Sequence, residues 1–289
     1  MTQSDNKSNN MKAIKHILFL CVALCFATSC KKDVDLTLMQ KTILEDVDFR
    51  YLAVDDAWQV TVVADSVTYV ELEYSAYLEP YLKTKLDGLR LEIGFTGNVR
   101  PVINSEFRAT VHANSIDEIN AHDASQLVFS GHFASTSDCV TVHLEDASVC
   151  TGLDYSGNEF LVIVEDASQF LGFHLNGTMS EVKMSDASTC KGDFDMNSEL
   201  YIIMNDASRL VTFGGAVPYV DIKLQDACLL NMVQTDVNRM GVRLSGASEA
   251  TVNALEQLYG GLTEASTLYY KGHPQLNVDC SDDSQLIPF

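Results

Sequence analysis

Short hydrophobic runs with alternating polar positions recur along most of the chain. Between residues 116 and 289 the tripeptide Asp-Ala-Ser occurs five times and is followed by variants, with third positions 18 to 23 residues apart. Eight, six and four residues before most third positions the side chains are apolar, as in Val140, Val142 and Leu144. Apolar side chains at every second position are typical of a strand with one buried face. The pattern therefore predicts a repeated strand.

Each repeat contains a strand of about five residues, a tight corner at Asp-Ala-Ser, a short second strand and a Gly-containing loop. One such unit cannot bury its apolar face, whereas stacked units bury a continuous core. We therefore predict an all-β fold, a right-handed parallel β-helix (β-solenoid) with coils of about 20 residues. A coil of 40 residues is the alternative, because the outward-facing pairs alternate in character, but each 20-residue unit already contains a complete corner.

The first corner position carries an acidic residue in six repeats and Gly in a seventh: Asp123, Asp146, Asp166, Asp186, Asp206, Asp226 and Gly246. We call the six carboxylates the corner Asp column. They repel one another at a rung spacing of about 4.8 Å. We expect each to be solvated and to accept a hydrogen bond from its own turn, with Ala fitting a corner that has little interior room. A row of Ca²⁺ sites is the alternative, but no calcium-binding motif accompanies the column, so we predict no metal and no cofactor.

Residues 47–115 lack this tripeptide but also alternate as strands, for example from Leu89 to Phe95. We expect these N-terminal strands to cap the first coil, because an exposed sheet edge invites pairing with another chain. The prediction is one domain over residues 47–289, with N-terminal strands at 47–115 and repeat coils at 116–289.

The first 29 residues have the pattern of an export signal. Two lysines precede an eleven-residue apolar run from Ile17 to Ala27, and Thr28-Ser29-Cys30 follows. The run is shorter than the roughly 20 residues of a membrane-spanning helix. Small residues before a cysteine resemble a bacterial lipobox. We predict a lipoprotein signal peptide at 1–29 and a lipidated N-terminus and tether at 30–46, with acyl chains such as palmitate on Cys30. The alternative is an ordinary signal peptide, and translation starts at either Met1 or Met11.

The charge balance excludes one class of partner. Lys and Arg total 19 against 40 Asp and Glu, a net charge of -21. Such a chain repels a phosphate backbone, so we predict no nucleic acid partner.

The cysteines and histidines show no metal-site spacing. The cysteines beyond Cys30 are Cys139, Cys150, Cys190, Cys228 and Cys280. They form no C-x-x-C motif, so we expect reduced, buried side chains. Cys150 and Cys190 fall two rungs apart, which is too far for a disulfide. The seven histidines share no column and predict no metal site.

Catalytic motifs are also missing from the sequence. No G-x-S-x-G, H-E-x-x-H or P-loop occurs. An outward row of Lys183, Lys223 and Arg243 either binds an anionic polymer or balances Glu181 and Asp221 on a solvated face. Four tyrosines near the N-terminus are a candidate sugar-stacking or protein-binding patch: Tyr69, Tyr74, Tyr77 and Tyr81.

A family resemblance rests on the lipobox, the strand from Leu89 to Ile93 and the serial corners. Ser245-Gly246-Ala247-Ser248 and Tyr270-Lys271-Gly272-His273-Pro274 carry its motifs. The chain resembles the "putative auto-transporter adhesin, head GIN domain" family of Bacteroidetes over about residues 47–286, with Asp replacing the usual Gly at six corners. The resemblance implies a β-helix on an exported protein and carries over no functional residues.

These observations predict a lipid-anchored, non-catalytic binding or adhesion scaffold of the outer membrane. Its attachment is the lipid at Cys30, and its ligand is an unidentified protein or glycan. The alternative is a β-helix lyase or hydrolase acting on polysaccharide. Periplasmic or surface orientation and oligomeric state stay open.

Overall fold

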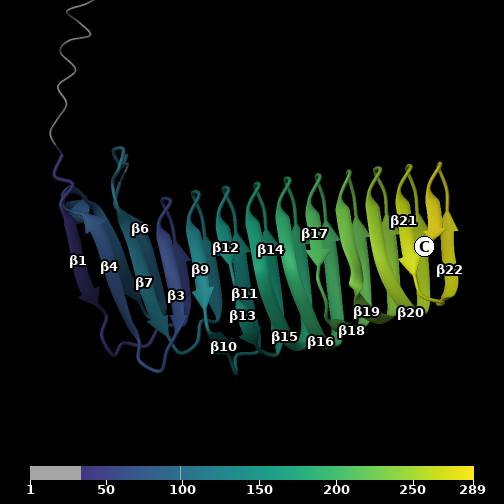
Figure 1. Ribbon diagram of the computed structural model, residues 1–289, viewed down its shortest axis with the longest axis horizontal. Helices are drawn as coiled ribbons and strands as arrows, with labels where there is room; N and C mark the ends of the chain where they lie inside the picture. The colour runs from purple at the N-terminus through teal and green to yellow at the C-terminus, as the bar shows by residue number, and fades with distance from the viewer. Residues whose placement is uncertain (1–33, 98) are drawn as a thin grey trace, which may run out of the picture. The chain divides into compact units, whose positions relative to one another are not determined.

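The computed structural model describes residues 34–97 and 99–289, so the predicted signal peptide and Cys30 lie outside the described residues. Residues 36–289 form one compact unit built almost wholly of strands (Figure 1). Its N-terminal part contains β1 (Leu38–Ile43), β2 (Tyr51–Val54), β3 (Gln59–Ala64), β4 (Tyr69–Ser75), the 3₁₀ helix η1 (Ala76–Tyr81), β5 (Leu82–Asp87), β6 (Arg90–Phe95) and β7 (Phe107–Ala113).

The repeat region continues with shorter and then longer strands. They are β8 (Glu118–Ala121), β9 (Gln126–Ser130), β10 (His132–Ala134), β11 (Cys139–Leu144), β12 (Val149–Thr151), β13 (Asp154–Ser156), β14 (Glu159–Val164), β15 (Gln169–Met184), β16 (Thr189–Met204), β17 (Arg209–Thr212), β18 (Ala216–Leu224), β19 (Leu229–Leu244), β20 (Glu249–Leu262), β21 (Thr267–Lys271), β22 (Gln275–Cys280) and β23 (Gln285–Pro288).

The strands stack in parallel with the predicted 20-residue period. Val162 of β14 pairs with Val182 of β15, which pairs with Ile202 of β16 and then Ile222 of β18. Each step along this row advances the chain by one repeat, so the β-solenoid is confirmed and the 40-residue coil is wrong. β15 and β16 also run through the segment expected to be a loop. A register shift between Leu171 and Phe173 of β15 turns Phe173 inward, where it is buried.

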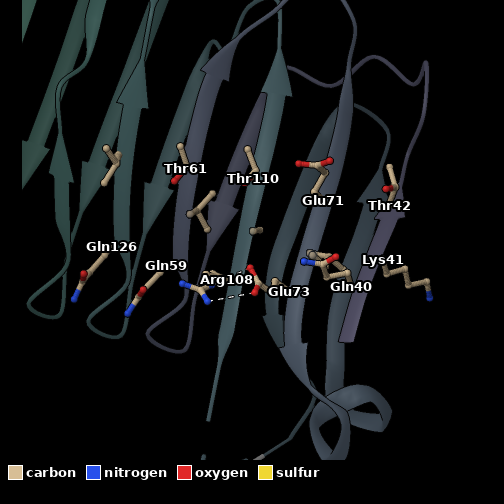
Figure 2. Close-up of a pocket in the computed structure, with 14 residues that line it drawn as sticks. Gln40, Lys41, Thr42, Gln59, Thr61, Glu71, Glu73, Arg108, Thr110 and Gln126 are labelled. Atoms are coloured by element: carbon tan, nitrogen blue, oxygen red, sulfur yellow. Dashed lines mark hydrogen bonds and ion pairs between the residues drawn. The ribbon is translucent and has the colours of Figure 1, made fainter. Parts of the chain in front are cut away.

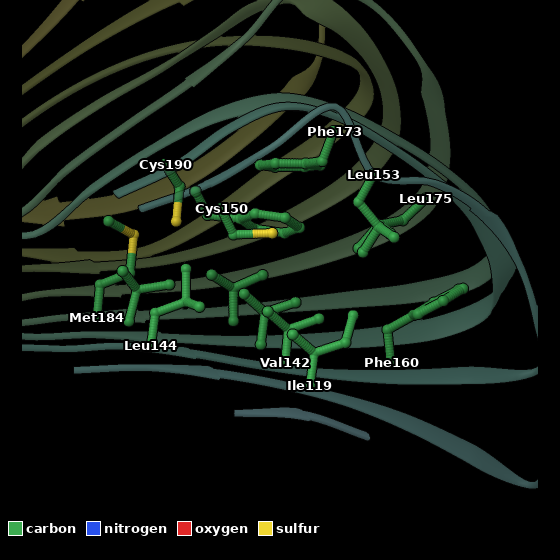
Figure 3. Packing of buried hydrophobic residues seen from close by; sticks show 14 of the residues in the cluster. Ile119, Val142, Leu144, Cys150, Leu153, Phe160, Phe173, Leu175, Met184 and Cys190 are labelled. Carbon is green, nitrogen blue, oxygen red and sulfur yellow. The ribbon is translucent and has the colours of Figure 1, made fainter. Parts of the chain in front are cut away.

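The core is a continuous column of buried apolar side chains inside the coils. Figure 3 shows part of it, with Cys150 and Cys190 among Leu, Val and Phe side chains. Both cysteines pair with Phe170 and so lie two rungs apart, as expected. They and Cys228 are buried free thiols. Cys139 and Cys280 are exposed, so the prediction of burial is wrong for these two, which lie at strand ends outside the inward columns.

The corners are built from two consecutive residues in the left-handed region. At one corner Asp146 has φ 54° and Ala147 has φ 60°. Asp tolerates this conformation better than most residues, and Gly246, with φ 62°, has no steric cost there. Asp therefore replaces Gly at a position that requires a positive φ. The Ala147 N–H donates to the Asp166 carbonyl of the next corner at 2.9 Å, so a backbone ladder ties the corners together.

The interior of the corner is occupied by Ser and not by Ala. Asp146 and Ala147 are exposed, whereas Ser148 and Ser168 are fully buried. The Ser148 N–H donates to the Ser168 hydroxyl at 3.1 Å. The expectation that Ala fills a cramped interior is thus wrong, because the two left-handed residues turn their side chains outward and the third residue points in.

The N-terminal part stacks out of sequence order. β2 lies between β6 and β8, and β3 lies between β7 and β9, all in parallel. The corner between β2 and β3 is Asp56–Ala57, followed by buried Trp58 in the place of Ser. Residues within the segment 47–115 thus form coils of their own. Antiparallel β4 and β1 extend the N-terminal edge of the strand stack that contains β7 and β3, and antiparallel β5 extends the N-terminal edge of the stack that contains β6 and β2, in the position expected for a cap.

The described residues, 34–97 and 99–289, contain no helix that is long and apolar enough to cross a bilayer.

Candidate binding groove at the N-terminal end

A cavity of about 460 Å³ opens on the outer face of the sheet formed by β1, β4, β7, β3 and β9. We call it the groove. Figure 2 shows its polar side chains on neighbouring strands. Its lining comprises Gln40, Lys41, Thr42, Gln59, Val60, Thr61, Glu71, Leu72, Glu73, Arg108, Ala109, Thr110, Gln126 and Val128.

Strand register explains why polar groups converge there. Side chains two residues apart point to the same face of a strand, so each strand contributes a pair to the groove. Cross-strand pairing then makes two rows, first Gln40, Glu73, Arg108, Gln59 and Gln126, and second Thr42, Glu71, Thr110, Thr61 and Val128. The buried face of β3, β4, β7 and β9 holds the apolar residues between them, so the amphipathic pattern of these strands positions the groove.

One ion pair organises the centre of the groove. Arg108 Nε lies 3.1 Å from Glu73 Oε2, and the second guanidinium nitrogen donates to Glu73 Oε1 at 3.3 Å. This two-point contact fixes the planes of both groups. Arg108 neutralises Glu73, and Glu71 is the remaining charge in the two rows, so the groove face carries one net negative charge although the chain is strongly acidic.

The four N-terminal tyrosines do not form one patch. Tyr74 is buried, and burial raises the pKa of its hydroxyl. Tyr69 stacks on His112 with ring centroids 4.0 Å apart, and the Tyr77 hydroxyl bonds with Ser105. Tyr81 is exposed. The candidate patch is therefore wrong, because the alternation of β4 sends Tyr74 into the core.

The corner Asp column lies exposed along the edge of the coils. Within the part of the chain that the structure describes, none of its six carboxylates accepts a hydrogen bond from its own turn. That expectation is wrong, because the N–H of the following Ala bonds to the next corner. The solvated position of the column is as expected.

Two members of the basic row on the outer face of the other sheet are paired with acids. Lys183 Nζ lies 3.1 Å from Glu181, and Arg243 lies 2.8 Å from Asp221. These contacts favour the interpretation of a solvated, charge-balanced face.

Next to this row lies an aromatic cluster that the sequence analysis missed. The Tyr259 hydroxyl donates to the Tyr219 hydroxyl at 3.1 Å, and Tyr219 stands edge-on to Tyr201 at 6.4 Å. A hydrogen bond to Glu199 raises the pKa of Tyr201 to about 12. Tyr201 and Tyr259 lie in one cross-strand row through Asp221 and Gly241, and Tyr219 lies in the row two residues before it. The repeat period was the available signal, since equivalent positions of successive repeats stack.

Two histidines lie side by side, although the sequence analysis expected no cluster because the histidines share no column. His122 lies three residues before its corner Ser and His143 lies five before the next, and their ring centroids are 5.8 Å apart. Neighbouring outward columns therefore meet, although no single column holds both.

The architecture defines a β-solenoid protein. The profile of the "putative auto-transporter adhesin, head GIN domain" family matches residues 48–274, and the chain belongs to this family. No curated protein matches the chain by sequence.

Solved structures share the fold. A structure described as a putative adhesin from Parabacteroides merdae is 13% identical, with a TM-score of 0.67 over 87% of this chain and 96% of that one. A structure described as a putative lipid binding protein from Parabacteroides distasonis is 12% identical, with a TM-score of 0.66 over 89% of this chain and 98% of that one. At these identities the likeness concerns the fold alone.

Proposed function

We propose that this protein is an exported, non-catalytic adhesion scaffold, anchored to the outer membrane by a lipid on Cys30, whose groove binds a neutral glycan. The glycan proposal rests on the side chains that line the groove. Gln40, Gln59 and Gln126 each offer an amide donor and acceptor, and the threonine hydroxyls offer both as well. Sugar hydroxyls need that combination of partners.

Charge and polarity narrow the ligand class. The acidic chain repels anionic polymers, whereas the groove face itself carries a single net negative charge. A protein ligand is usually held by buried aromatic or aliphatic anchors, and the amide-rich rows offer few pockets for them. The same polar lining disfavours an acyl chain. Family membership and the neighbours described as adhesins support a binding role, and nothing in the comparisons favours the enzyme alternative.

The glycan proposal is tested with variants of groove side chains. We expect Arg108→Ala to weaken binding to a neutral glycan selected from an array by about 10- to 100-fold, because a charged hydrogen-bonding group is lost. Gln59→Ala is expected to weaken it by about fivefold. Gln169→Ala is the matched control, because Gln169 lies in the same cross-strand row but outside the groove.

Two results would count against the glycan proposal. Equal affinities in all four proteins would place the ligand elsewhere on the solenoid. Capture by matrix proteins alone, with no glycan bound, would replace the glycan by a protein ligand.

The anchor is tested separately. Cys30→Ser removes the thiol that would carry the lipid, and we expect the protein to move from the membrane fraction to the soluble fraction and to lose metabolic lipid label. The acidic chain has little attraction of its own for anionic headgroups. Unchanged fractionation and labelling would show that the attachment lies elsewhere.

A further inference from the structure

A histidine and two glutamates converge on the outer face of β11 and β14, away from the groove. His143 belongs to β11, Glu145 follows that strand, and Glu165 occupies the equivalent position one coil later. His143 Nε2 lies 3.7 Å from Glu145 Oε2 and 3.7 Å from Glu165 Oε2. The three ligand atoms all lie within 4.8 Å of one another.

The separations fit a shared ion better than hydrogen bonds. A nitrogen–oxygen hydrogen bond is usually no longer than about 3.2 Å. Ligand atoms at about 2.0–2.2 Å from a tetrahedral ion are about 3.4 Å apart, which is close to the two 3.7 Å separations from His143 Nε2. The two glutamate oxygens lie within 4.8 Å of each other and would move together on binding the ion. His143 Nε2 is shielded from solvent and has no hydrogen-bond partner, although the side chain as a whole is 30% exposed. The nitrogen thus lacks the partner that its buried position calls for.

A second histidine supports the same site. His122 Nδ1 is paired with Glu145 Oε1, the oxygen that does not face His143. Metal-ligating carboxylates are typically oriented by such an outer partner. The His122 ring also stands edge-on to His143, at an interplanar angle of 81°. Glu145 is therefore fixed with one oxygen toward His122 and the other toward Glu165 and His143.

We propose that His143, Glu145 and Glu165 bind a divalent transition-metal ion such as Zn²⁺, with a fourth position open to solvent or to a ligand. Imidazole nitrogen selects Zn²⁺ and its neighbours over Ca²⁺ and Mg²⁺, which take oxygen ligands. The exposed side of the site admits the ion, because Glu165 is 40% exposed. The site is independent of the groove and differs from the Ca²⁺ row considered for the corner Asp column.

Zinc titration of the purified, metal-free protein tests this site. We expect one Zn²⁺ per chain by calorimetry, a higher melting temperature with Zn²⁺, and no comparable effect of Ca²⁺. His143→Gln and Glu165→Gln should each weaken Zn²⁺ binding by at least about 100-fold. His122→Gln should weaken it by about 10- to 100-fold, since it removes only the orienting partner.

His174→Gln is the matched control. His174 Nε2 also lies 3.7 Å from a carboxylate, that of Asp195, and no second acid completes a ligand set there among the described residues. This variant should bind Zn²⁺ like the wild type. Weak Zn²⁺ binding at several sites, equal in all variants, would assign the ions to the acidic surface and overturn the proposal. Absence of Zn²⁺ binding by the wild type would overturn it as well.

Discussion

Ile202→Asp is expected to abolish folding. Ile202 is fully buried in the centre of the solenoid and pairs with Val182 on one side and Ile222 on the other. The change removes an apolar side chain from the core and leaves a carboxylate there without a partner. The two effects together cost more than about 5 kcal/mol, which is comparable with the whole stability of a typical domain. Circular dichroism and urea titration of the purified variant measure the loss.

Ile203→Asp is the matched control for this prediction. Ile203 is the next residue of β16 but points outward, between Lys183 and Lys223 on the neighbouring coils. A carboxylate at this position is in contact with solvent and lies between two positive charges. The melting temperature of the Ile203→Asp protein should therefore stay close to that of the wild type. Equal melting temperatures for Ile202→Asp and Ile203→Asp would contradict the assignment of Ile202 to the inward-facing row and of Ile203 to the outer face.

Gly260→Ala is expected to cause the second largest loss of stability. Gly260 has φ 132°, which L side chains rarely adopt, and an added Cβ would lie 1.9 Å from the Val242 carbonyl oxygen. Neither the backbone of β19 nor that of β20 can move without breaking the parallel pairing at this position. Strain and overlap together cost about 3 kcal/mol or more. The melting temperature should fall by roughly 6–12 °C.

Gly261→Ala is the matched control. It distinguishes the clash at Gly260 from a general intolerance of Ala in this part of β20. The nearest atom to an added Cβ at Gly261 is 3.9 Å away, and its φ is not in the left-handed region. We expect Gly261→Ala to melt within about 2 °C of the wild type. Because coils of a solenoid contact only their neighbours, Gly260→Ala should first expose the C-terminal coils to protease. A Gly260→Ala protein as stable as Gly261→Ala would show that the pairing of β19 and β20 relaxes freely at this position.

The repeat coils were predictable because each side chain in them has an equivalent in the next coil. Val142, Val162 and Val182 share one inward row, and the period of two places such residues without knowledge of the structure. Ser148 was harder to place, because the sequence does not show which corner residue points inward. That direction follows from the positive φ of Asp146 and Ala147.

The N-terminal part was less predictable because its coils do not stack in sequence order. Trp58 replaces Ser after Asp56–Ala57, so the tripeptide pattern does not reveal this corner. The bulky ring is accommodated because it packs against Phe95 and Phe107, with ring centroids 5.5 and 5.9 Å away. Both partners come from strands that follow much later in the sequence.

The groove was not predictable for the same reason. Its central ion pair joins Glu73 of β4 to Arg108 of β7, an antiparallel contact across 35 residues. Cross-strand neighbours of this kind are set by tertiary pairing and leave no local signal. His122 and His143 were missed because their columns are different but adjacent.

The most direct test of the binding role is a calorimetric titration of the purified protein with the neutral glycan from the array, with reducing ends assayed in the same samples. The scaffold predicts saturable binding that is weakened in Arg108→Ala, and no release of new reducing ends. Product formation by the wild type that is lost in Lys183→Ala or Arg243→Ala would contradict the scaffold and establish the polysaccharide enzyme.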